Sequence, residues 1–371
     1  MADLGEIARS VGEEYLQTRR TTRFQRKALR AIARCRTEAM GWVETICEEC
    51  GEEYPLFRSC RNRSCPRCQA QARAAWLDAR ERELLAVPYF HVVFTVPEAL
   101  NVFALHCPEV FYAALLQAAG TALLEVGYTK LGARLGALII LHTWGQNLSL
   151  HPHAHCVVPG GGFSDDRKRW ISVRNPAFLL PVKVLSRRFR TLLCRSLRNA
   201  ARKGQLHRLP QSVLTETVME NAAAQEWIVY AKPPFGGPEQ VLEYLSRYTH
   251  RVAISNRRIL SYADGKVTFE WRDYADSNRV KQSTIDALEF LRRFLMHVLP
   301  DRFVRIRYFG FLSNRHRAEN IALARTLIGR SEPLRFRDRS EQQLLCPDCY
   351  AAKLAASIRT LRSPPGAISA A

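Results

Sequence analysis

The sequence predicts an α+β fold that is built on an antiparallel sheet. Two apolar, β-branched segments, 136–144 (GALIILHTW) and 153–162 (HAHCVVPGGG), flank a polar turn and are typical of a hairpin. A second hairpin is expected at 257–271, around the turn residues Asp264 and Gly265. A third apolar run, 89–97, ends in a proline and is typical of a strand. Hairpins join antiparallel neighbours, so these segments favour an antiparallel sheet with helices added around it.

The remaining elements follow from apolar periodicity and from helix breakers. Segment 226–251 reads as a strand, a Pro/Gly loop and a helix, in which Gly237 is the cap and Pro238 suits the first turn. The other helices are expected at 22–40, 72–85, about 108–126, 183–203 and 284–298, and a further strand at 303–312. The first and fourth of these helices are strongly basic.

The net charge limits the possible classes of function more than the overall composition does. The chain has 371 residues, enough for two or three domains, and 47% of them are hydrophobic, which excludes disordered and fibrous classes. Lys and Arg number 55 against 35 acidic residues, which gives a net charge of +20 that is spread along the chain. Such a surface favours a polyanion, and DNA or RNA is the usual partner. A basic enzyme that binds no nucleic acid is the alternative.

The chain is expected in the cytoplasm, associated with the nucleoid when active. Its first residues, MADLGEIARSVGEEYLQ, contain no apolar region of a signal peptide, and the run LGALII is too short to span a bilayer. No membrane partner is expected. Cytosolic thiols stay reduced, so the eleven cysteines need a role other than disulfide formation.

Two Cys-x-x-Cys pairs near the N-terminus predict a structural zinc site. Cys47 and Cys50 (CEEC) and Cys65 and Cys68 (CPRC) have the spacing of two zinc knuckles, each of which turns two thiolates toward one ion. Cys60 is a possible substitute for one of the four. Unligated or redox-active cysteines are the alternative interpretation.

Other cysteines and the charges around the knuckles complete this module. Cys35 is expected to be a buried helix residue, and the CPDC pair, Cys346 and Cys349, resembles half a knuckle without a clear second half. Arg61 and Arg63, which lie between the pairs, are expected to contact nucleic acid. The module is expected to span 1–86, followed by a catalytic domain at 87–320 and a basic tail at 321–371.

Four of the ten histidines lie within 142–156, and three of them predict a metal site. His153 and His155 alternate, so on a strand both face the same side of the sheet. If His142 lies opposite His153 in the hairpin, the three imidazoles surround one point above the sheet. Mg²⁺ or Mn²⁺ in such a site would keep positions open for phosphate oxygens. Gln146 is a reserve ligand, His151 is expected off the site, and solvated histidines at a strand end are the alternative.

Two tyrosines are candidate nucleophiles. Tyr244 and Tyr248 are four residues apart and so share one face of the expected helix. A phenol has a pKa near 10 and reacts poorly until a metal or a base assists it. The basic side chains around the pair are candidate phosphate ligands: Arg247, His250 and Arg251. Half-buried packing residues are the alternative interpretation of the tyrosines.

Read in order, these motifs resemble the insertion-sequence-91 family of bacterial transposases, which belong to the HUH (His-hydrophobic-His) endonucleases. The similar segments are CEECG, SCRNRSCPRCQ, HVVFTVPEAL, LHTWGQNLSLHPHAHCVVPGGG, YLSRYTHRVAISNRR and VRIRYFGFLSN. They run from about residue 24 to 320 and so cover most of the chain. Ser64 stands where the family has His, which leaves open how Cys60 enters the zinc ligand set.

The resemblance implies a fold and a reaction. The expected core is an antiparallel HUH sheet that carries His153 and His155, with the tyrosines on a nearby helix. The implied function is a transposase that nicks and rejoins single-stranded DNA at transposon ends through a 5′-phosphotyrosine, in rolling-circle-type transposition. Tyr244 and Tyr248 match the two-tyrosine motif, and His142 matches the third ligand of related relaxases.

Three rival functions remain open from the sequence. A plasmid relaxase or replication initiator would share the same chemistry, although no helicase domain is present to suggest a large relaxase. A zinc-ribbon DNA-binding protein would not be an enzyme at all. A zinc hydrolase that uses His142, His153 and His155 would turn over without a protein–DNA adduct.

Overall fold

The computed structural model describes residues 2–47, 49–232, 240–241, 252–274, 276–329, 354–355 and 361–362. The chain divides into two compact units that are not consecutive in sequence. The first unit combines Met1–Ala72, Ile254–Val298 and Arg337–Ala371, and the second combines Arg73–Ala253 and Leu299–Phe336. Residues 254–298, which the sequence analysis assigned to the catalytic domain, therefore belong with the N-terminal unit.

One part of the first unit packs helices against a three-stranded sheet. Helices α1 (Leu4–Thr18) and α2 (Arg23–Arg34) contact each other, and α1 contacts α9 (Ala287–Leu295). The sheet has the order β11-β10-β9, built from Arg279–Asp286, Lys266–Asp273 and Ile259–Ala263 after the short η3 (Asn256–Arg258). The predicted turn is confirmed: Asp264 (φ 51°) and Gly265 (φ 69°) both adopt the left-handed conformation of a tight hairpin.

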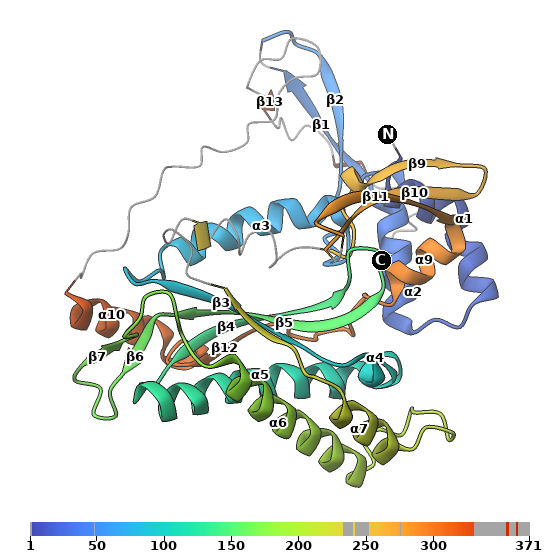
Figure 1. Cartoon of the computed structure of the whole chain (residues 1–371). Coiled ribbons are helices and arrows are strands. Elements are labelled where there is room, and N and C mark those ends of the chain that lie inside the picture. The colour runs from blue at the N-terminus through green and yellow to red at the C-terminus, as the bar shows by residue number, and fades with distance from the viewer. Residues whose placement is uncertain are drawn as a thin grey trace. The chain divides into compact units, whose positions relative to one another are not determined.

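The other part of the first unit is a ribbon centred on β1 (Trp42–Cys47), which follows η1 (Glu38–Met40). Strand β2 (Glu53–Phe57) pairs with β1 along its whole length, and the short strands β13 (Leu354–Ala355) and β14 (Leu361–Arg362) also pair with β1. All of these pairings are antiparallel. Segments from the two ends of the sequence thus meet on one strand (Figure 1).

Two helices of this unit differ in length from the prediction. Helix 22–40 ends at Arg34, because Cys35 turns to extended backbone (ψ 123°) and Arg36 has a φ of 56°. Helix 284–298 begins only at Ala287, where the Asp286 carboxylate caps it by accepting from the backbone amides of Leu288 and Glu289. The residues before that cap belong to β11 and pair with β10 instead.

The second unit is built on a five-stranded antiparallel sheet. Its order is β12-β4-β5-β3-β8, from Ile306–Gly310, Gly136–Trp144, Leu150–Pro159, Tyr89–Thr95 and Val229–Lys232. The predicted hairpin and the strand at 89–97 are confirmed. Smaller elements surround the sheet: η2 (Glu98–Leu100), α4 (Asn101–His106), β6 (Gly161–Phe163), β7 (Trp170–Ser172), η4 (Asn314–His316) and α10 (Arg317–Ile328).

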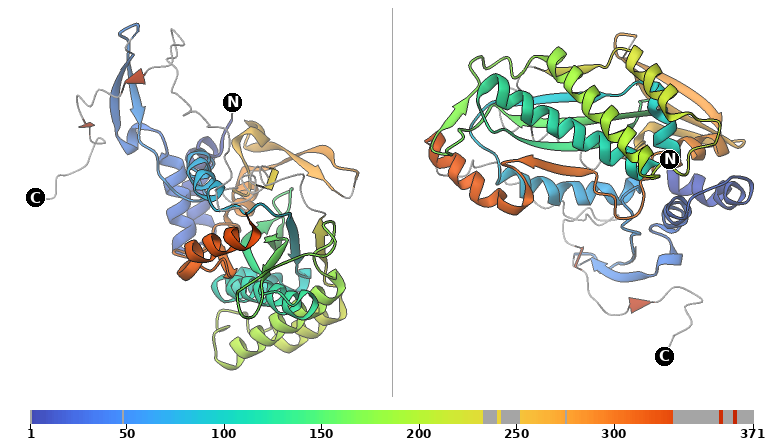
Figure 2. Two further views of the ribbon diagram at one scale, coloured as in Figure 1. Left: turned by 90° about the vertical axis from the view of Figure 1, so that its left-hand side faces the viewer. Right: turned by 90° about the horizontal axis from the view of Figure 1, so that it is seen from below.

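One face of this sheet is buried under helices. Helices α5 (Pro108–Leu131), α6 (Val182–Arg202) and α7 (Thr215–Ala224) lie on this side (Figures 1 and 2). Alternate strand residues such as Phe94, Leu141 and Cys156 pack there against Phe189 and Leu193 of α6. Helix α5 is long and apolar enough to cross a bilayer, but 67% of its most apolar window is buried, as in the core helix of a globular unit.

The opposite face of the sheet carries the histidines. Leu138 and Ile140 of β4 and Val157 of β5 form a smaller cluster with Leu77, which lies on α3 (Pro66–Glu81). Helix α3 starts earlier than the predicted 72–85, because Pro66 has the fixed φ that suits a first helical position. Because Leu77 lies in the C-terminal half of α3, this half of the helix covers the face on which His142 and His155 lie.

Candidate metal centres

Three histidines converge on one face of the paired strands β4 and β5. His142 lies directly opposite His153, and His155 lies two residues further along β5 on the same face. Each histidine offers one ring nitrogen, and these three nitrogens all lie within 4.8 Å of one another. The structure thus brings together His142, His153 and His155, in the pairing register that the sequence analysis assumed. Three neutral imidazoles on one side of a point form half of an octahedral site or most of a tetrahedral one.

Hydrogen bonds to their outer nitrogens orient two of these rings. The Nδ1 of His153 lies 2.6 Å from the carbonyl oxygen of His151, and since a carbonyl only accepts, Nδ1–H is the donor. The neutral ring of His153 therefore keeps its lone pair on Nε2. Such a backbone hydrogen bond is the usual way to fix the tautomer of a metal-binding histidine.

A fourth histidine, His91 on β3, contacts His155 on the neighbouring strand β5. Its Nε2 lies 2.8 Å from Nδ1 of His155, and the two rings are nearly coplanar, with an interplanar angle of 8°. His155 presents a lone pair on Nε2 only if its Nδ1–H donates to His91. His91 must then be neutral in order to accept. The sequence analysis missed this residue, because its relevance depends on which strand lies beside β5.

Burial keeps the imidazoles of His91 and His153 neutral. Desolvation, with smaller contributions from the charges of Lys232 and His153, lowers the pKa of His91 to about 3. Desolvation likewise lowers the pKa of His153 to about 4, although the hydrogen bond to the His151 carbonyl oxygen raises this pKa. Neutral imidazole is the form that binds metal, so protons compete weakly with a cation at physiological pH.

The neighbours of the three rings have distinct positions. Trp144 stacks on His142, with ring centroids 4.7 Å apart and an interplanar angle of 19°, which holds this buried histidine in place. His151 is exposed and is not one of the three converging residues, although its carbonyl oxygen orients His153. Gln146 is half-buried in the turn between the strands.

The candidate nucleophiles and their basic neighbours lie outside the described residues. This applies to Tyr244, Tyr248, Arg247, His250 and Arg251. The described residues that precede them belong to the unit that holds the histidines: β8 ends at Lys232, and the side chain of Val241 packs in the cluster with Leu138 and Ile140. Val241 therefore lies on the histidine face, three residues before Tyr244.

Four cysteines converge in the first unit. Cys35 follows α2, Cys60 lies in the loop after β2, and Cys65 and Cys68 lie at the start of α3. Their sulfur atoms are 3.6 Å apart for Cys35–Cys68 and Cys60–Cys68, and 3.7 Å for Cys35–Cys65. Tetrahedral Zn²⁺ with bonds of ~2.3 Å requires sulfurs roughly 3.8 Å apart, so the cluster fits a structural zinc ion.

The thiol chemistry of the cluster also suits a cation. A hydrogen bond from the Cys60 side chain lowers the pKa of Cys65 to about 5, whereas burial raises the pKa of Cys35 to about 11. Four adjacent thiolates repel one another, and a divalent cation offsets that repulsion and stabilises all four.

The converging cysteines differ from the predicted zinc ligand set. Cys65 and Cys68 take part, and Cys60 takes part as the possible substitute, but Cys35 rather than Cys47 or Cys50 completes the cluster. Cys47 and Cys50 lie at the tip of the β1–β2 hairpin, whereas the cluster lies beyond its base, where the Arg58 amide donates to Gly41. Strand β1 has six residues and spans roughly 17 Å in steps of ~3.3 Å from its first to its last residue, which is too far for the two knuckles to share one ion.

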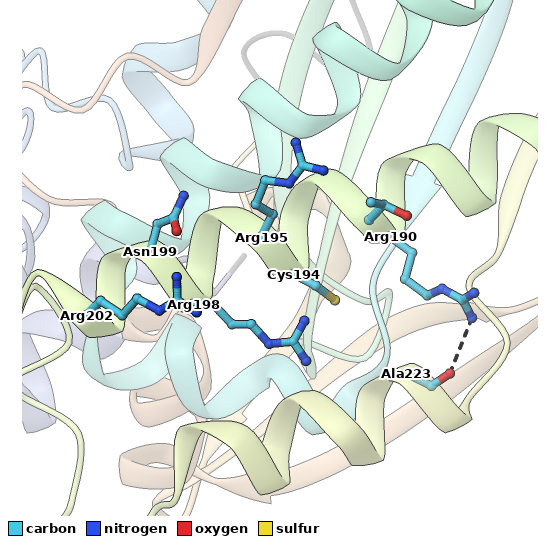
Figure 3. A pocket seen from close by; sticks show the side chains of 8 residues that line it. Arg190, Cys194, Arg195, Arg198, Asn199, Arg202 and Ala223 are labelled. Carbon is cyan, nitrogen blue, oxygen red and sulfur yellow. Dashed lines mark hydrogen bonds between the residues drawn. The ribbon is translucent and has the colours of Figure 1, made fainter.

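Basic side chains occupy two described surfaces. Arg61 is exposed and Arg63 is half-buried in the loop next to the cysteine cluster. In the second unit, arginines of α6 line a groove of about 420 Å³ against α7 (Figure 3). The lining comprises Arg190, Thr191, Cys194, Arg195, Arg198, Asn199, Arg202 and Ala223.

The arginines of this groove differ in their partners. Arg198 makes a bidentate ion pair with Glu216. Arg190 donates to the carbonyl oxygen of Ala223 (Figure 3). Arg195 and Arg202 lie exposed on the same helix. Since α6 packs on the sheet face opposite the histidines, this charge lies away from the histidine site.

Comparisons with known proteins show which proteins the chain resembles. A family model described as "Transposase zinc-binding domain" matches residues 7–96, and one described as "Putative transposase" matches residues 136–320. The chain is 45% identical to the putative transposase y4qJ of Sinorhizobium fredii, over 95% of this chain and 94% of that protein. It is 29% identical to the transposase for insertion sequence element IS801 of Pseudomonas savastanoi pv. phaseolicola, over 76% of this chain and 68% of that protein.

No solved structure matches the chain significantly. The two family models together cover the cysteine cluster and the paired histidines, and the relative from S. fredii extends over nearly the whole length. The chain belongs to the insertion-sequence-91 family of transposases, with a zinc-binding domain at its N-terminus.

Proposed function

We propose that this transposase is an HUH endonuclease, which nicks and rejoins single-stranded DNA at transposon ends through a tyrosine. The observation that carries the proposal is the convergence of His142, His153 and His155 on one face of the sheet. Three neutral nitrogens fit a divalent ion such as Mg²⁺ or Mn²⁺, with positions left for phosphate oxygens. When bound, such an ion polarises the phosphodiester and stabilises charge on its oxygens.

The chain itself supplies the nucleophile in this proposal. The phenol oxygen of Tyr244 or Tyr248 attacks the phosphorus and loses its proton, the bond from phosphorus to the 3′ oxygen breaks, and that oxygen gains a proton. The products are a 5′-phosphotyrosine and a free 3′-hydroxyl. Attack by a 3′-hydroxyl on the phosphotyrosine reverses these steps and joins a strand without ATP. Support comes from the two-tyrosine motif and from Val241, whose side chain packs on the histidine face.

The positive charge of the chain supports contacts with the DNA backbone. Arg195 and Arg202 in the α6 groove, and Arg61 beside the cysteine cluster, are exposed guanidinium groups suited to phosphates. The α6 groove lies on the face away from the histidines, so it would hold a DNA segment other than the one being cut.

A covalent adduct tests the proposal. The purified chain is incubated with labelled single-stranded DNA of a transposon end and Mn²⁺, and the products are separated on a denaturing gel. We expect a labelled protein band, with the DNA mapped by mass spectrometry to Tyr244 or Tyr248 and lost in the double Tyr→Phe variant. Tyr262→Phe is the matched control, because this tyrosine belongs to the other unit. Cleavage that leaves no adduct would instead identify a hydrolase, and an adduct on another residue would refute the site.

A further inference from the structure

The histidine face of the five-stranded sheet continues past the histidines toward β8. Val93 of β3 lies directly opposite His155 on one side and directly opposite Tyr230 of β8 on the other. Residues that lie opposite each other in antiparallel strands point to the same side of the sheet, so these three side chains form one row. The residues that flank Tyr230 on β8, Val229 and Ala231, pack in the core on the other face, which agrees with this assignment.

A second row lies beside the first. Thr95 of β3 lies opposite His153, and its backbone amide donates to the carbonyl oxygen of Ile228 over 3.0 Å. Since Ile228 precedes Tyr230 by two residues and continues the same pairing, its side chain lies on the same face. The backbone hydrogen bonds of the sheet therefore hold both rows in a fixed position relative to the histidines.

The outer part of these rows is exposed. Ile228 is 61% exposed and Tyr230 is 52% exposed, while Val93 between Tyr230 and His155 is half-buried. Strands lie ~4.8 Å apart, so the backbone of Tyr230 is about 10 Å from that of His155. Two large apolar side chains that are exposed side by side, next to a candidate metal site, indicate a surface that binds a ligand with a flat apolar face.

Lys232 adds a positive charge to this surface. It is exposed and lies directly opposite His91, at the end of β8. After burial, the charge of Lys232 is the largest influence that lowers the pKa of His91. An aromatic ring with a cation beside it suits single-stranded nucleic acid, because a base stacks on the ring while the cation contacts a phosphate.

We propose that Tyr230, Ile228 and Val93 form a platform on which one base of a single DNA strand stacks, with Lys232 contacting the backbone of that strand. The inference rests on the proposed function, since the strand is the one whose phosphate lies at the histidines. Given the separation of about 10 Å, the stacked base lies within about two nucleotides of that phosphate. Every base has a flat face, so the platform positions the strand without reading its sequence.

The fluorescent base 2-aminopurine measures this stacking directly. It is placed in turn at each position of a single-stranded oligonucleotide of a transposon end, and the full chain is added in the presence of a chelator, so that no nicking is required. We expect the emission to change at one position or at two adjacent positions. Tyr230→Phe and Tyr230→Trp should keep this change, because both retain a ring.

Tyr230→Ala should remove the change in emission and weaken binding by roughly 5- to 100-fold, as the loss of one stacked base does. Fluorescence anisotropy measures the affinity. Lys232→Gln should weaken binding several-fold and lower the slope of log K against log salt by about 1. Tyr128→Ala, in a similarly exposed tyrosine of α5 in the same unit, is the matched control and should behave like the wild type.

Three results would overturn the platform. The first is a Tyr230→Ala protein with wild-type emission and affinity; if this variant still forms the covalent adduct, the nuclease proposal stands without the platform. The second is a Tyr230→Ala protein that binds DNA normally but changes the oligomeric state of the free chain, which would identify a contact between copies. The third is a stacked position far from the nicked phosphate. Stacking that depends on Tyr230 in a chain that forms no adduct would instead support the platform and refute the nicking chemistry alone.

Discussion

His91 on β3 and His155 on β5 are joined by a hydrogen bond of 2.8 Å between Nε2 and Nδ1. The near-coplanar rings place this bond in the plane of both imidazoles. His91 is thus a positioning residue: as an acceptor, it selects the tautomer of His155 that presents Nε2 to the site. A buried neutral histidine is well suited to that task, because it keeps an acceptor lone pair at neutral pH.

Replacing His91 should therefore weaken metal binding without removing a ligand. We expect His91→Phe to weaken the apparent affinity for Mn²⁺ by about 10- to 100-fold, the usual effect of losing such a partner. The measurement is the Mn²⁺ dependence of adduct formation, and saturating Mn²⁺ should restore most of the rate. His207→Asn, in an exposed histidine of the same unit, is the control. A normal Mn²⁺ dependence of His91→Phe would show that His91 has no positioning role.

The depressed pKa of His91 predicts how stability responds to acid. The unfolded value is about 6.5 and the folded value about 3, because burial disfavours the charged ring. Between these values the native state binds fewer protons, so this group makes the free energy of unfolding fall by about 1.4 kcal/mol per pH unit below 6.5. Without added Mg²⁺ or Mn²⁺, urea unfolding at pH 7 and pH 5 should show a loss in the wild type that exceeds that of His91→Phe by roughly 2 kcal/mol. Equal losses would contradict the buried, neutral state of this ring.

Replacing Cys35 tests which cysteines bind the structural zinc ion. Its sulfur lies 3.6 Å and 3.7 Å from those of Cys68 and Cys65. We expect Cys35→Ser to lose one zinc ion per chain and to lower the melting temperature of the first unit, because zinc binding contributes to folding. Metal content and thermal unfolding check this. Cys107→Ala, in a buried cysteine of the second unit, should lose stability without losing zinc. A Cys35→Ser protein that keeps its full zinc content would return the site to Cys47 and Cys50.

The α6 groove predicts a contribution to DNA affinity that depends on salt. The double variant Arg195→Gln/Arg202→Gln should bind single-stranded DNA several-fold more weakly near 100 mM salt and lower the slope of log K against log salt by about 1 to 2. Fluorescence anisotropy over a salt series measures both quantities. Arg174→Gln, in an exposed arginine outside the groove, serves as the control. An unchanged slope in the double variant would exclude DNA from this groove.

Much of the sheet and of the histidine site followed from the sequence. The alternation of His153 and His155 fixes their common face, and hairpin pairing sets His142 opposite His153. His91 did not follow, because its place beside His155 depends on the sheet order β4-β5-β3, a long-range pairing without a local signal. The tyrosines are assigned by motif alone, since both lie outside the described residues.

The zinc site shows a second limit of local spacing. Two Cys-x-x-Cys pairs separated by a short segment are typical of one site, but here that segment forms a β-strand that separates the pairs. Cys35 carried no such signal, because its position in a predicted helix concealed the end of that helix at Arg34. Residues 254–298 likewise join the first unit through tertiary packing that no linker in the sequence marks.

The central claim is that His142, His153 and His155 hold the cation that nicking requires. Its most direct measurement compares Mn²⁺ binding, by calorimetry, with the yield of covalent DNA adduct in the three single His→Ala variants. His151→Ala is the matched control, because it is exposed and leaves the carbonyl oxygen that orients His153 in place. The account predicts that each of the three variants loses Mn²⁺ binding and lowers the adduct yield roughly 100-fold or more, whereas His151→Ala keeps both. Variants of the three histidines that bind Mn²⁺ and form adduct like the wild type would contradict it.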